Sequence, residues 1–524
     1  MPDIFILTGI SLLAALSITP LARSLATRWG LIDTPDSQRK LHRGVIPLAG
    51  GPAVLAATTL ALLAMCLFSA AMRELLANNV GELLPLLVAA IVLVAVGMLD
   101  DRVHLRGRQK LAGQMIAAAI LIGSGLTIRN IAVFGFEVEL GLFAIPFTVV
   151  WLLGAINALN LIDGADGLAT TIGLICSTGI AVMATLGGQT SEAVVAAALA
   201  GALLGFLFFN FPPARAFLGD SGSMLIGLVV GALAIRSSLK GPATVALAAP
   251  VAMLTIPIFD SAMAVLRRKL TGRSIYMGDR GHLHHRLLRH GYSDRVMLLV
   301  VAVLSAATAS GAMLSVYLKN ELVALLSGAT VVSILIASRI FGYSELVLLA
   351  QRLVAFSESL IVSGDGTSLI RQKTVRLQGT YDWDEMWHEV TDFAQRFDLA
   401  RVELDMHLPW LHEGYNASWD RGSLPEPAQR WSLVAPLSVE GRLLGRIEFV
   451  GHAGPTPTHE VFGALADLLE SIGNHAVELV NPATELEHER SDELAAMDDL
   501  WPSVEKTATT ENSSQLSVTH AGQG

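Results

Sequence analysis

Cysteine and charge are both scarce in this 524-residue sequence. Its two cysteines, Cys66 and Cys176, each lie inside an apolar run. They exclude a disulfide framework and argue against a cysteine-based metal site. Charged residues make up 16% of the chain and apolar residues 52%, whereas soluble globular proteins carry about 25% charged residues. With a mean hydropathy of +0.54, the composition predicts a membrane protein.

The few charges are unevenly distributed along the chain. Up to residue 343 there are 24 Lys and Arg and 17 Asp and Glu, whereas the remainder holds 12 and 29. We therefore expect a basic membrane domain over 1–343 followed by an acidic, water-soluble part. The first apolar run, 3–22, lacks a preceding basic residue, which favours a retained span over a signal peptide.

Apolar stretches long enough to cross a bilayer, about 20 residues each, recur along the first domain. They predict eleven transmembrane helices, with Pro257 kinking the ninth, at 3–22, 47–70, 82–99, 111–128, 141–158, 168–186, 193–210, 222–236, 242–266, 296–316 and 321–341. Every strongly basic loop follows an odd-numbered span. Because Lys and Arg favour the cytoplasmic side, we expect the N-terminus outside and the C-terminal part in the cytoplasm.

Five polar clusters lie at the expected cytoplasmic ends of these spans. The first contains Lys40 and His42 and leads into Gly50-Gly51. Basic side chains and the N–H groups of a helix start bind anions, although an ordinary positively charged loop would look alike.

The second cluster is the pair Asp100-Asp101, followed by basic residues that include Lys110. Carboxylates at a membrane boundary are costly to desolvate and tend to face a functional cavity. They could bind Mg²⁺ or orient a phosphate. The alternative is a solvated loop that pairs with its own arginines.

The third cluster places Asn157, Asn160, Asp163 and Asp166 between two strongly apolar spans. Buried amides and carboxylates must be hydrogen-bonded or bound to a ligand. The spacing of the aspartates is similar to a calcium loop, but the 12-residue ligand series of an EF-hand is missing.

The fourth cluster, Phe217 to Ser223, places Asp220 at a helix start. There its carboxylate could hold a metal or a phosphate, or act only as an N-cap. Phe217 could stack on a base or anchor the loop in the membrane interface.

The fifth cluster contains Arg280, His282, His284 and His285. Three close histidines suggest zinc, but their spacing and the nearby arginines oppose it. An Arg/His cluster instead suits a pyrophosphate. Together the clusters indicate phosphoryl transfer from a nucleotide-activated group to a lipid acceptor.

These clusters, in this order, resemble the polyprenyl-phosphate N-acetylhexosamine-1-phosphate transferase family over roughly residues 20–295. One position departs from the family pattern, because His104 stands where a third aspartate often follows the pair Asp100-Asp101.

The resemblance implies a UDP-sugar and a polyprenyl phosphate as substrates, UMP as a product, and Mg²⁺, replaceable by Mn²⁺, as the cofactor. It implies Asp220 and Asn160 as metal ligands. The catalytic residues it implies are Asp100, Asp101, Asp163, Asp220 and His282. The substrate-binding residues it implies are Lys40, His42, Lys110, Asn157, Asp166, Phe217, Arg280, His284 and His285. Phe217 would lie against uracil, and the aspartate pair would act on the lipid phosphate.

The His-x-His-His spacing resembles the branch that uses UDP-N-acetylglucosamine to begin a cell-envelope glycan such as lipopolysaccharide O-antigen or teichoic-acid linkage. The peptidoglycan branch, which transfers phospho-MurNAc-pentapeptide, typically has three consecutive histidines. Transfer of that group or of another N-acetylhexosamine is the alternative. We expect direct attack by the lipid phosphate, with a covalent aspartyl-phosphate route through Asp100 or Asp220 left open.

Beyond residue 343 the pattern changes to an α+β domain over 344–481. Strands are expected at 399–405 and 431–450, and helices at 382–397 and 459–480. This order resembles a GAF-type fold whose ligand or protein partner is unknown. Residues 482–524 are polar and acidic, which predicts disorder. Regulation of the enzyme by this tail is a hypothesis that a truncation near residue 345 would test.

We therefore expect a multi-pass enzyme of the bacterial inner membrane. A membrane receptor or transporter with a cytoplasmic sensor is the non-enzyme alternative, but a transporter should carry polar residues at mid-membrane. No nucleic-acid partner is expected, and a homodimer is left open.

Overall fold

The computed structural model divides the chain into two compact units, Met1–Ala355 and Phe356–Gly524. It describes residues 2–33, 45–133, 136–239, 247–270, 281–347, 349–350, 353, 371–378, 383–408, 413–421, 429–439, 442–452, 460–475 and 477. The boundary expected after residue 343 comes before this division, and the predicted disordered tail over 482–524 lies outside the described residues.

Among the described residues of the first unit, eight helices are long and apolar enough to cross a membrane. They are α1 (Pro2–Arg28), α2 (Gly50–Phe68), α4 (Val80–Val103), α6 (Ala144–Ile162), α7 (Leu168–Leu186), α8 (Thr190–Asn210), α9 (Gly219–Leu239) and α13 (Asp294–Leu318). Eight of the eleven expected spans therefore coincide with such helices.

The other three expected spans are shorter or interrupted helices. The fourth and eleventh coincide with α5 (Gly107–Gly123) and α14 (Glu321–Ala337). The ninth divides into α10 (Ala248–Met253) and α11 (Thr255–Leu270). The predicted kink at Pro257 was therefore misplaced, since the break precedes it at Leu254. Pro257 lies in the first turn of α11, where a missing N–H costs no intrahelical hydrogen bond.

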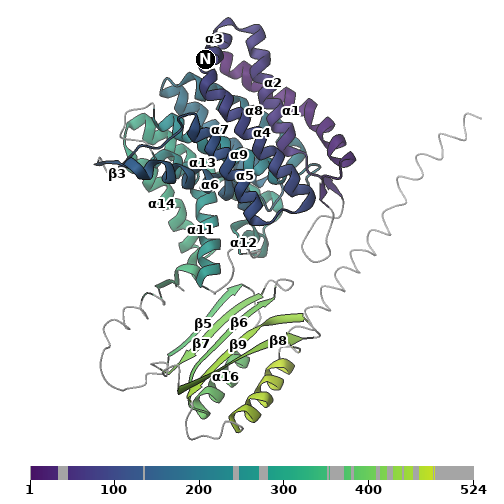
Figure 1. The fold of residues 1–524 in the computed structure, drawn as a ribbon, viewed down its shortest axis with the longest axis vertical. Helices are drawn as coiled ribbons and strands as arrows, with labels where there is room; N and C mark the ends of the chain where they lie inside the picture. The colour runs from purple at the N-terminus through teal and green to yellow at the C-terminus, as the bar shows by residue number, and fades with distance from the viewer. Residues whose placement is uncertain are drawn as a thin grey trace, which may run out of the picture. The chain divides into compact units, whose positions relative to one another are not determined.

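The first unit also departs from an all-α domain. Its described residues include two antiparallel pairs of short strands, β1 (Ile32–Asp33) with β2 (Ile46–Pro47), and β3 (Asn130–Val133) with β4 (Phe136–Glu139). A short helix, α3 (Ala70–Asn78), lies at the same end of this unit as the N-terminus, and α12 (Leu283–Arg289) lies at the opposite end (Figure 1).

Helix α9 occupies the middle of the first unit, and most of its residues are buried. It packs against α4 and α6, while α1 packs against α8. Small residues allow these helices to approach closely. A Cβ atom on Gly97 of α4 would lie 2.3 Å from the Cα of Ser221 in α9, and one on Gly227 of α9 would lie 2.6 Å from the Cα of Ile156 in α6.

The second unit contains a five-stranded antiparallel sheet of order β5-β7-β6-β9-β8. Its strands are β5 (Arg371–Gln378), β6 (Leu399–Leu408), β7 (Glu413–Asp420), β8 (Arg430–Val439) and β9 (Arg442–His452). Helix α16 (Asp384–Arg396) and a helix over 460–475 share one apolar core with one face of this sheet. The expected strands and the helix over 382–397 are confirmed, as is the helix over 459–480 where its residues are described, and β5 and β7 were missed. The GAF-type resemblance stays a prediction.

The close contact between α4 and α9 yields a first prediction. Gly97→Ala would place a methyl group against backbone atoms of α9, so we expect it to reduce the free energy of unfolding by about 1–3 kcal/mol. The matched control is Gly81→Ala in the same helix, where an added Cβ meets nothing within 4 Å. Thermal unfolding in detergent measures both variants. Equal unfolding temperatures for the two would contradict the close packing.

Candidate active site

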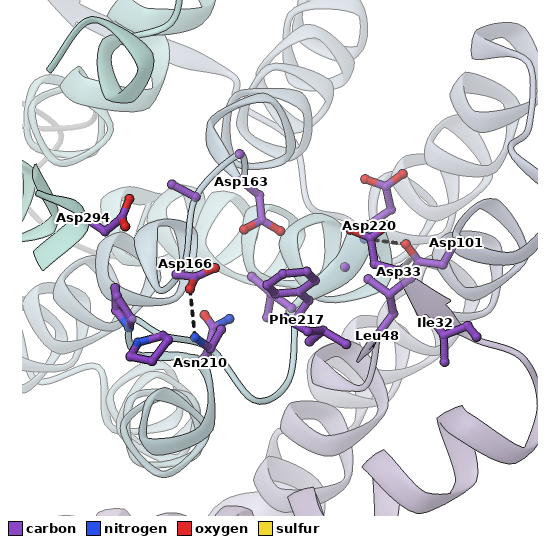
Figure 2. Close-up of a pocket in the computed structure, with 18 of the residues that line it drawn as sticks. Ile32, Asp33, Leu48, Asp101, Asp163, Asp166, Asn210, Phe217, Asp220 and Asp294 are labelled. Carbon is purple, nitrogen blue, oxygen red and sulfur yellow. Dashed lines mark hydrogen bonds between the residues drawn. The ribbon is translucent and has the colours of Figure 1, made fainter. Parts of the chain in front are cut away.

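A cavity of about 1290 Å³ opens in the first unit where the polar clusters meet. Its walls come from the hairpin β1–β2, the end of α4, the loops around residues 163–166 and 210–219, α12 and the start of α13. In Figure 2, Phe217 stands in the middle of the lining residues, with Asp166 and Asn210 to one side and Asp101 and Asp220 to the other. All five clusters seen in the sequence thus contribute to the wall of one cavity, the first of them through Ile46 and Leu48.

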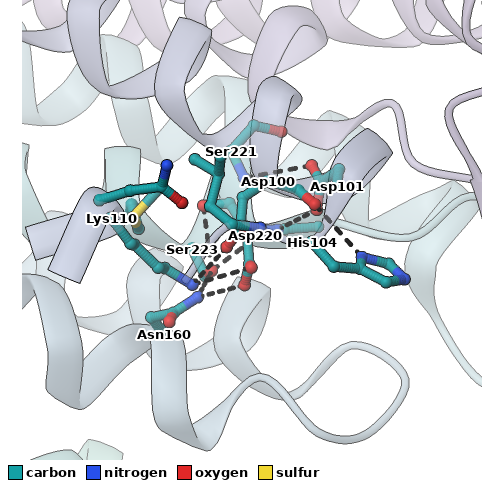
Figure 3. A network of polar contacts seen from close by, with 12 residues as sticks. Asp100, Asp101, His104, Lys110, Asn160, Asp220, Ser221 and Ser223 are labelled. Carbon is teal, nitrogen blue, oxygen red and sulfur yellow. Dashed lines mark hydrogen bonds and ion pairs between the residues drawn. The ribbon is translucent and has the colours of Figure 1, made fainter. Parts of the chain in front are cut away.

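Asp101 and the first turn of α9 form the structural centre of this site (Figure 3). The Oδ1 atom of Asp101 accepts a hydrogen bond from the backbone N–H of Asp220 at 2.9 Å, and Oδ2 accepts one from Ser221 at 3.4 Å. The first N–H groups of a helix have no intrahelical partner, and a carboxylate there is favoured by the helix dipole. Asp101 therefore caps α9 from the neighbouring helix and fixes the position of Asp220.

Lys110 of α5 joins Asp100 and Asp220. Its Nζ lies 3.0 Å from Asp100 Oδ2 and 2.8 Å from Asp220 Oδ2. Asp220 Oδ1 also accepts a hydrogen bond from the Asn160 side chain at 2.6 Å, and the backbone N–H of Leu105 donates to Asp100 Oδ1 at 2.7 Å. One lysine therefore holds two carboxylates from different helices together.

Asp163 and Asp166 lie on the loop between α6 and α7 and line the same cavity. The Asp166 carboxylate accepts a hydrogen bond from the backbone N–H of Ala214 at 2.8 Å. Burial raises the pKa of Asp163 well above its ordinary value, and the negative charges of Asp220, Asp101 and Asp166 raise this pKa further. The carboxylates around Asp163 thus carry more negative charge than nearby Lys110 balances.

The fifth cluster forms the start of α12 and is divided between the protein interior and the cavity. His282 Nδ1 lies 2.7 Å from Asp260 Oδ2, and Asp260 on α11 is completely buried. His284 is buried against Gly164, where an added Cβ would lie 2.6 Å from its Nε2 atom. Burial lowers the pKa of His284 well below its ordinary value, so this ring is neutral. His285 is the histidine of this cluster that lines the cavity.

Several predicted residues lie elsewhere or have unexpected partners. Asn157 exchanges two hydrogen bonds with Gln114 of α5, at 2.8 and 3.2 Å, and does not line the cavity. Lys40, His42 and Arg280 lie outside the described residues.

Asp260 and Gln114 lie outside the five polar clusters of the sequence. The signal for Asp260 was present, since a lone acid within an apolar helix of a membrane protein points to a buried partner. Gln114 carried no comparable signal, because its partner is 43 residues away in the chain.

Within the described part of the chain, no group of three or more His, Cys, Asp or Glu side chains has the geometry of a metal site. A site with fewer protein ligands is compatible with this geometry, because Mg²⁺ is commonly bound through one or two carboxylates and substrate phosphates. The oxygens of Asp100, Asp163 and Asp220 are of the type that such a hard cation requires.

Known proteins with related sequences identify the family. The model of glycosyl transferase family 4 matches residues 83–238, which extend from α4 to α9. A probable undecaprenyl-phosphate N-acetylglucosaminyl 1-phosphate transferase of Bacillus subtilis is 35% identical over 294 residues, covering 56% of this chain and 79% of that protein.

The chain belongs to glycosyl transferase family 4.

Two further relatives agree with this assignment. Decaprenyl-phosphate N-acetylglucosaminephosphotransferase of Mycobacterium tuberculosis is 34% identical, covering 59% of this chain and 82% of that protein. Undecaprenyl-phosphate alpha-N-acetylglucosaminyl 1-phosphate transferase of Escherichia coli K12 is 29% identical, covering 56% and 79%. The region matched by the glycosyl transferase family 4 model contains the aspartates of α4, α9 and the 163–166 loop, but not α12.

The crowding of carboxylates around Asp163 yields a second prediction. Asp163 has a raised pKa in the folded state, so in metal-free protein its ionisation lowers stability as pH rises from the ordinary Asp value through the folded pKa. We expect Asp163→Asn to raise the unfolding temperature at pH 7, by about 1–2 °C per kcal/mol of relieved repulsion, and to flatten the fall in stability as pH rises above the ordinary Asp value.

The matched control is Asp294→Asn, which changes a cavity-lining carboxylate that is not among the charges acting on Asp163. Thermal unfolding with a chelator present measures both variants. A lower unfolding temperature for Asp163→Asn at pH 7 would contradict the charge crowding.

Proposed function

We propose that the chain transfers N-acetylglucosamine 1-phosphate from UDP-GlcNAc to a polyprenyl phosphate, releasing UMP. The observation that carries the proposal is the convergence of Asp100, Asp101 and Asp220 with the 163–166 loop and Phe217 around one cavity, in a chain of glycosyl transferase family 4. The relatives named above support the choice of N-acetylglucosamine and of a polyprenyl acceptor.

In the proposed reaction, a phosphate oxygen of the lipid attacks the β-phosphorus of UDP-GlcNAc. A bond forms between these two atoms, the bond from the β-phosphorus to the bridging oxygen breaks, and UMP leaves with the electron pair. A phosphate monoester has a second pKa near ~6 and is mostly dianionic at neutral pH. A strong general base is therefore unnecessary, and the protein acts by positioning and electrostatic stabilisation.

The residues of the cavity divide this work. Asp101 holds the first turn of α9 in place, and Lys110 keeps Asp100 and Asp220 together. We assign uracil to the face of Phe217, the nucleotide phosphates to the region of the 163–166 loop and His285, and the lipid phosphate to the end of α4. His282 supports α12 through Asp260 and does not touch substrate in this assignment.

The site also suits Mg²⁺, with Asp220 and Asn160 as ligands. When bound, the ion would neutralise charge on the pyrophosphate. The surplus of carboxylates around Asp163 supports this part of the proposal, because a divalent cation would relieve their repulsion. In the structure Asn160 donates its amide to Asp220, so metal binding requires the amide to present its oxygen instead.

We further propose eleven membrane crossings, with the N-terminus outside and the cavity facing the cytoplasm. The supply of nucleotide sugars on that side supports this orientation, as does the excess of Lys and Arg in the loops beside the cavity.

Turnover by purified protein tests the proposed reaction. With UDP-GlcNAc, undecaprenyl phosphate and Mg²⁺ present, we expect UMP release that stops when the lipid is omitted or the metal is chelated. UDP-MurNAc-pentapeptide serves as the parallel donor. Release with this donor alone would keep the chemistry and overturn the sugar assignment, and no release with either donor would contradict the proposal.

Asp220 provides the sharpest test of the site. Asp220→Asn keeps the size of the side chain but removes its charge, so we expect kcat to fall by a factor on the order of 10²–10³. The control is Asp33→Asn, which changes a cavity-lining carboxylate on β1. UMP release at saturating substrate measures both. Normal turnover by Asp220→Asn, in protein with a wild-type unfolding temperature, would remove Asp220 from the catalytic site.

A further inference from the structure

The chain segment 339–347, which follows α14, returns to α11 and α12. Phe341 is completely buried and meets Phe259 of α11 edge to face, with ring centroids 5.4 Å apart. Gly342 has a φ of +85°, a backbone conformation that glycine adopts without strain. The turn at Gly342 thus directs the residues that follow it toward the ends of these two helices.

Glu345 is the charged residue that this turn buries. Its side chain is 0% exposed. It forms an ion pair with Arg267 of α11 and a second with Arg286 of α12, at 2.8 Å. Ser344 accepts a hydrogen bond from Arg286 at 3.0 Å and donates one to Glu345 at 2.9 Å. A charge this deeply buried is stable only when it is paired, so Glu345, Arg267 and Arg286 form one unit.

The same unit fixes the helix that carries the histidines. His282 at the N-cap of α12 is held by Asp260 of α11. Arg286, on the next turn of α12, is held by Glu345. Between these two attachments lie His284, packed against Gly164, and His285, which lines the cavity.

We propose that Glu345 is a positioning residue for the transfer reaction, acting through Arg286 to hold His285 and the 163–166 loop in place. The proposal rests on the proposed function for its kinetic consequence. Glu345 follows α14 in the chain, outside all five sequence clusters and outside the region 83–238 that the family model matches. Because α12 contacts the loop assigned to the nucleotide, we expect Glu345 to affect the binding of UDP-GlcNAc and not that of the lipid.

The test is Glu345→Gln in the full-length protein. Glutamine keeps the shape but removes the charge that two arginines share. We expect KM for UDP-GlcNAc to rise about tenfold, while KM for the polyprenyl phosphate is unchanged. Glu345→Asp keeps the charge and should recover part of the loss. A residue that only stabilised the fold would lower the yield of folded protein and leave both KM values unchanged.

The matched control is Glu82→Gln, which breaks the ion pair between Glu82 and Arg236. Glu82 lies near the start of α4, 18 residues and thus about 27 Å along the helix from Asp100. We expect this variant to retain both KM values. Equal kinetics for wild type and Glu345→Gln would overturn the positioning role.

Hydrogen exchange of the peptide over Leu283–Arg289 gives a readout that does not depend on catalysis. We expect faster exchange in Glu345→Gln than in wild type or Glu82→Gln. Unchanged exchange there would overturn the proposal even if the wild type releases no UMP. An inactive wild type with faster exchange in the variant would instead contradict the proposed function and leave the attachment of α12 supported.

Discussion

The contact between α4 and α9 is the constraint on which the site depends. Gly97 leaves no side chain between the two helices, so their backbones meet at Ser221. This close approach lets the carboxylate of Asp101 reach the free N–H groups of α9. A wider helix spacing would break the hydrogen bonds between these N–H groups and the carboxylate. Buried polar groups without hydrogen bonds raise the free energy of the folded state. Packing and chemistry are therefore set by the same few atoms.

The aspartates around the cavity look equivalent in the sequence but have different partners. Asp101 binds backbone amides, Asp166 binds the amide of Ala214, and Asp100 and Asp220 share Lys110. No hydrogen bond to the Asp163 carboxylate is found among the described residues, and its pKa is raised. Some of these carboxylates therefore hold the helix ends and loops in place, whereas Asp163 adds negative charge beside the cavity without such a partner. That division follows from which donors each helix end presents.

Local properties could be predicted from the sequence, whereas pairings between helices could not. Span length, basic loops and polar clusters each depend on a few neighbouring residues, and they located most of the transmembrane helices and the five clusters that contribute to the cavity wall. The family resemblance implies a substrate-binding role for Asn157, but its hydrogen-bond partner Gln114 belongs to another helix and could not be inferred from the motif. The resemblance likewise implies a catalytic role for His282, whereas its contact with Asp260 of α11 appears only in the structure. In the second unit, β5 and β7 were missed because their polar residues hide the alternation that marked β6 and β9.

Glu345 lies beyond the domain boundary expected from charge but inside the first unit. The composition changes after residue 343 because the apolar spans end there, but the first unit continues to Ala355. Glu345 lies between these points and pairs with Arg267 and Arg286 inside the first unit. A truncation near residue 345 removes the second unit and disturbs α12 together, so lost activity would say nothing about regulation. A truncation after Ala355 retains the buried ion pairs, and only that cut isolates the contribution of the C-terminal unit.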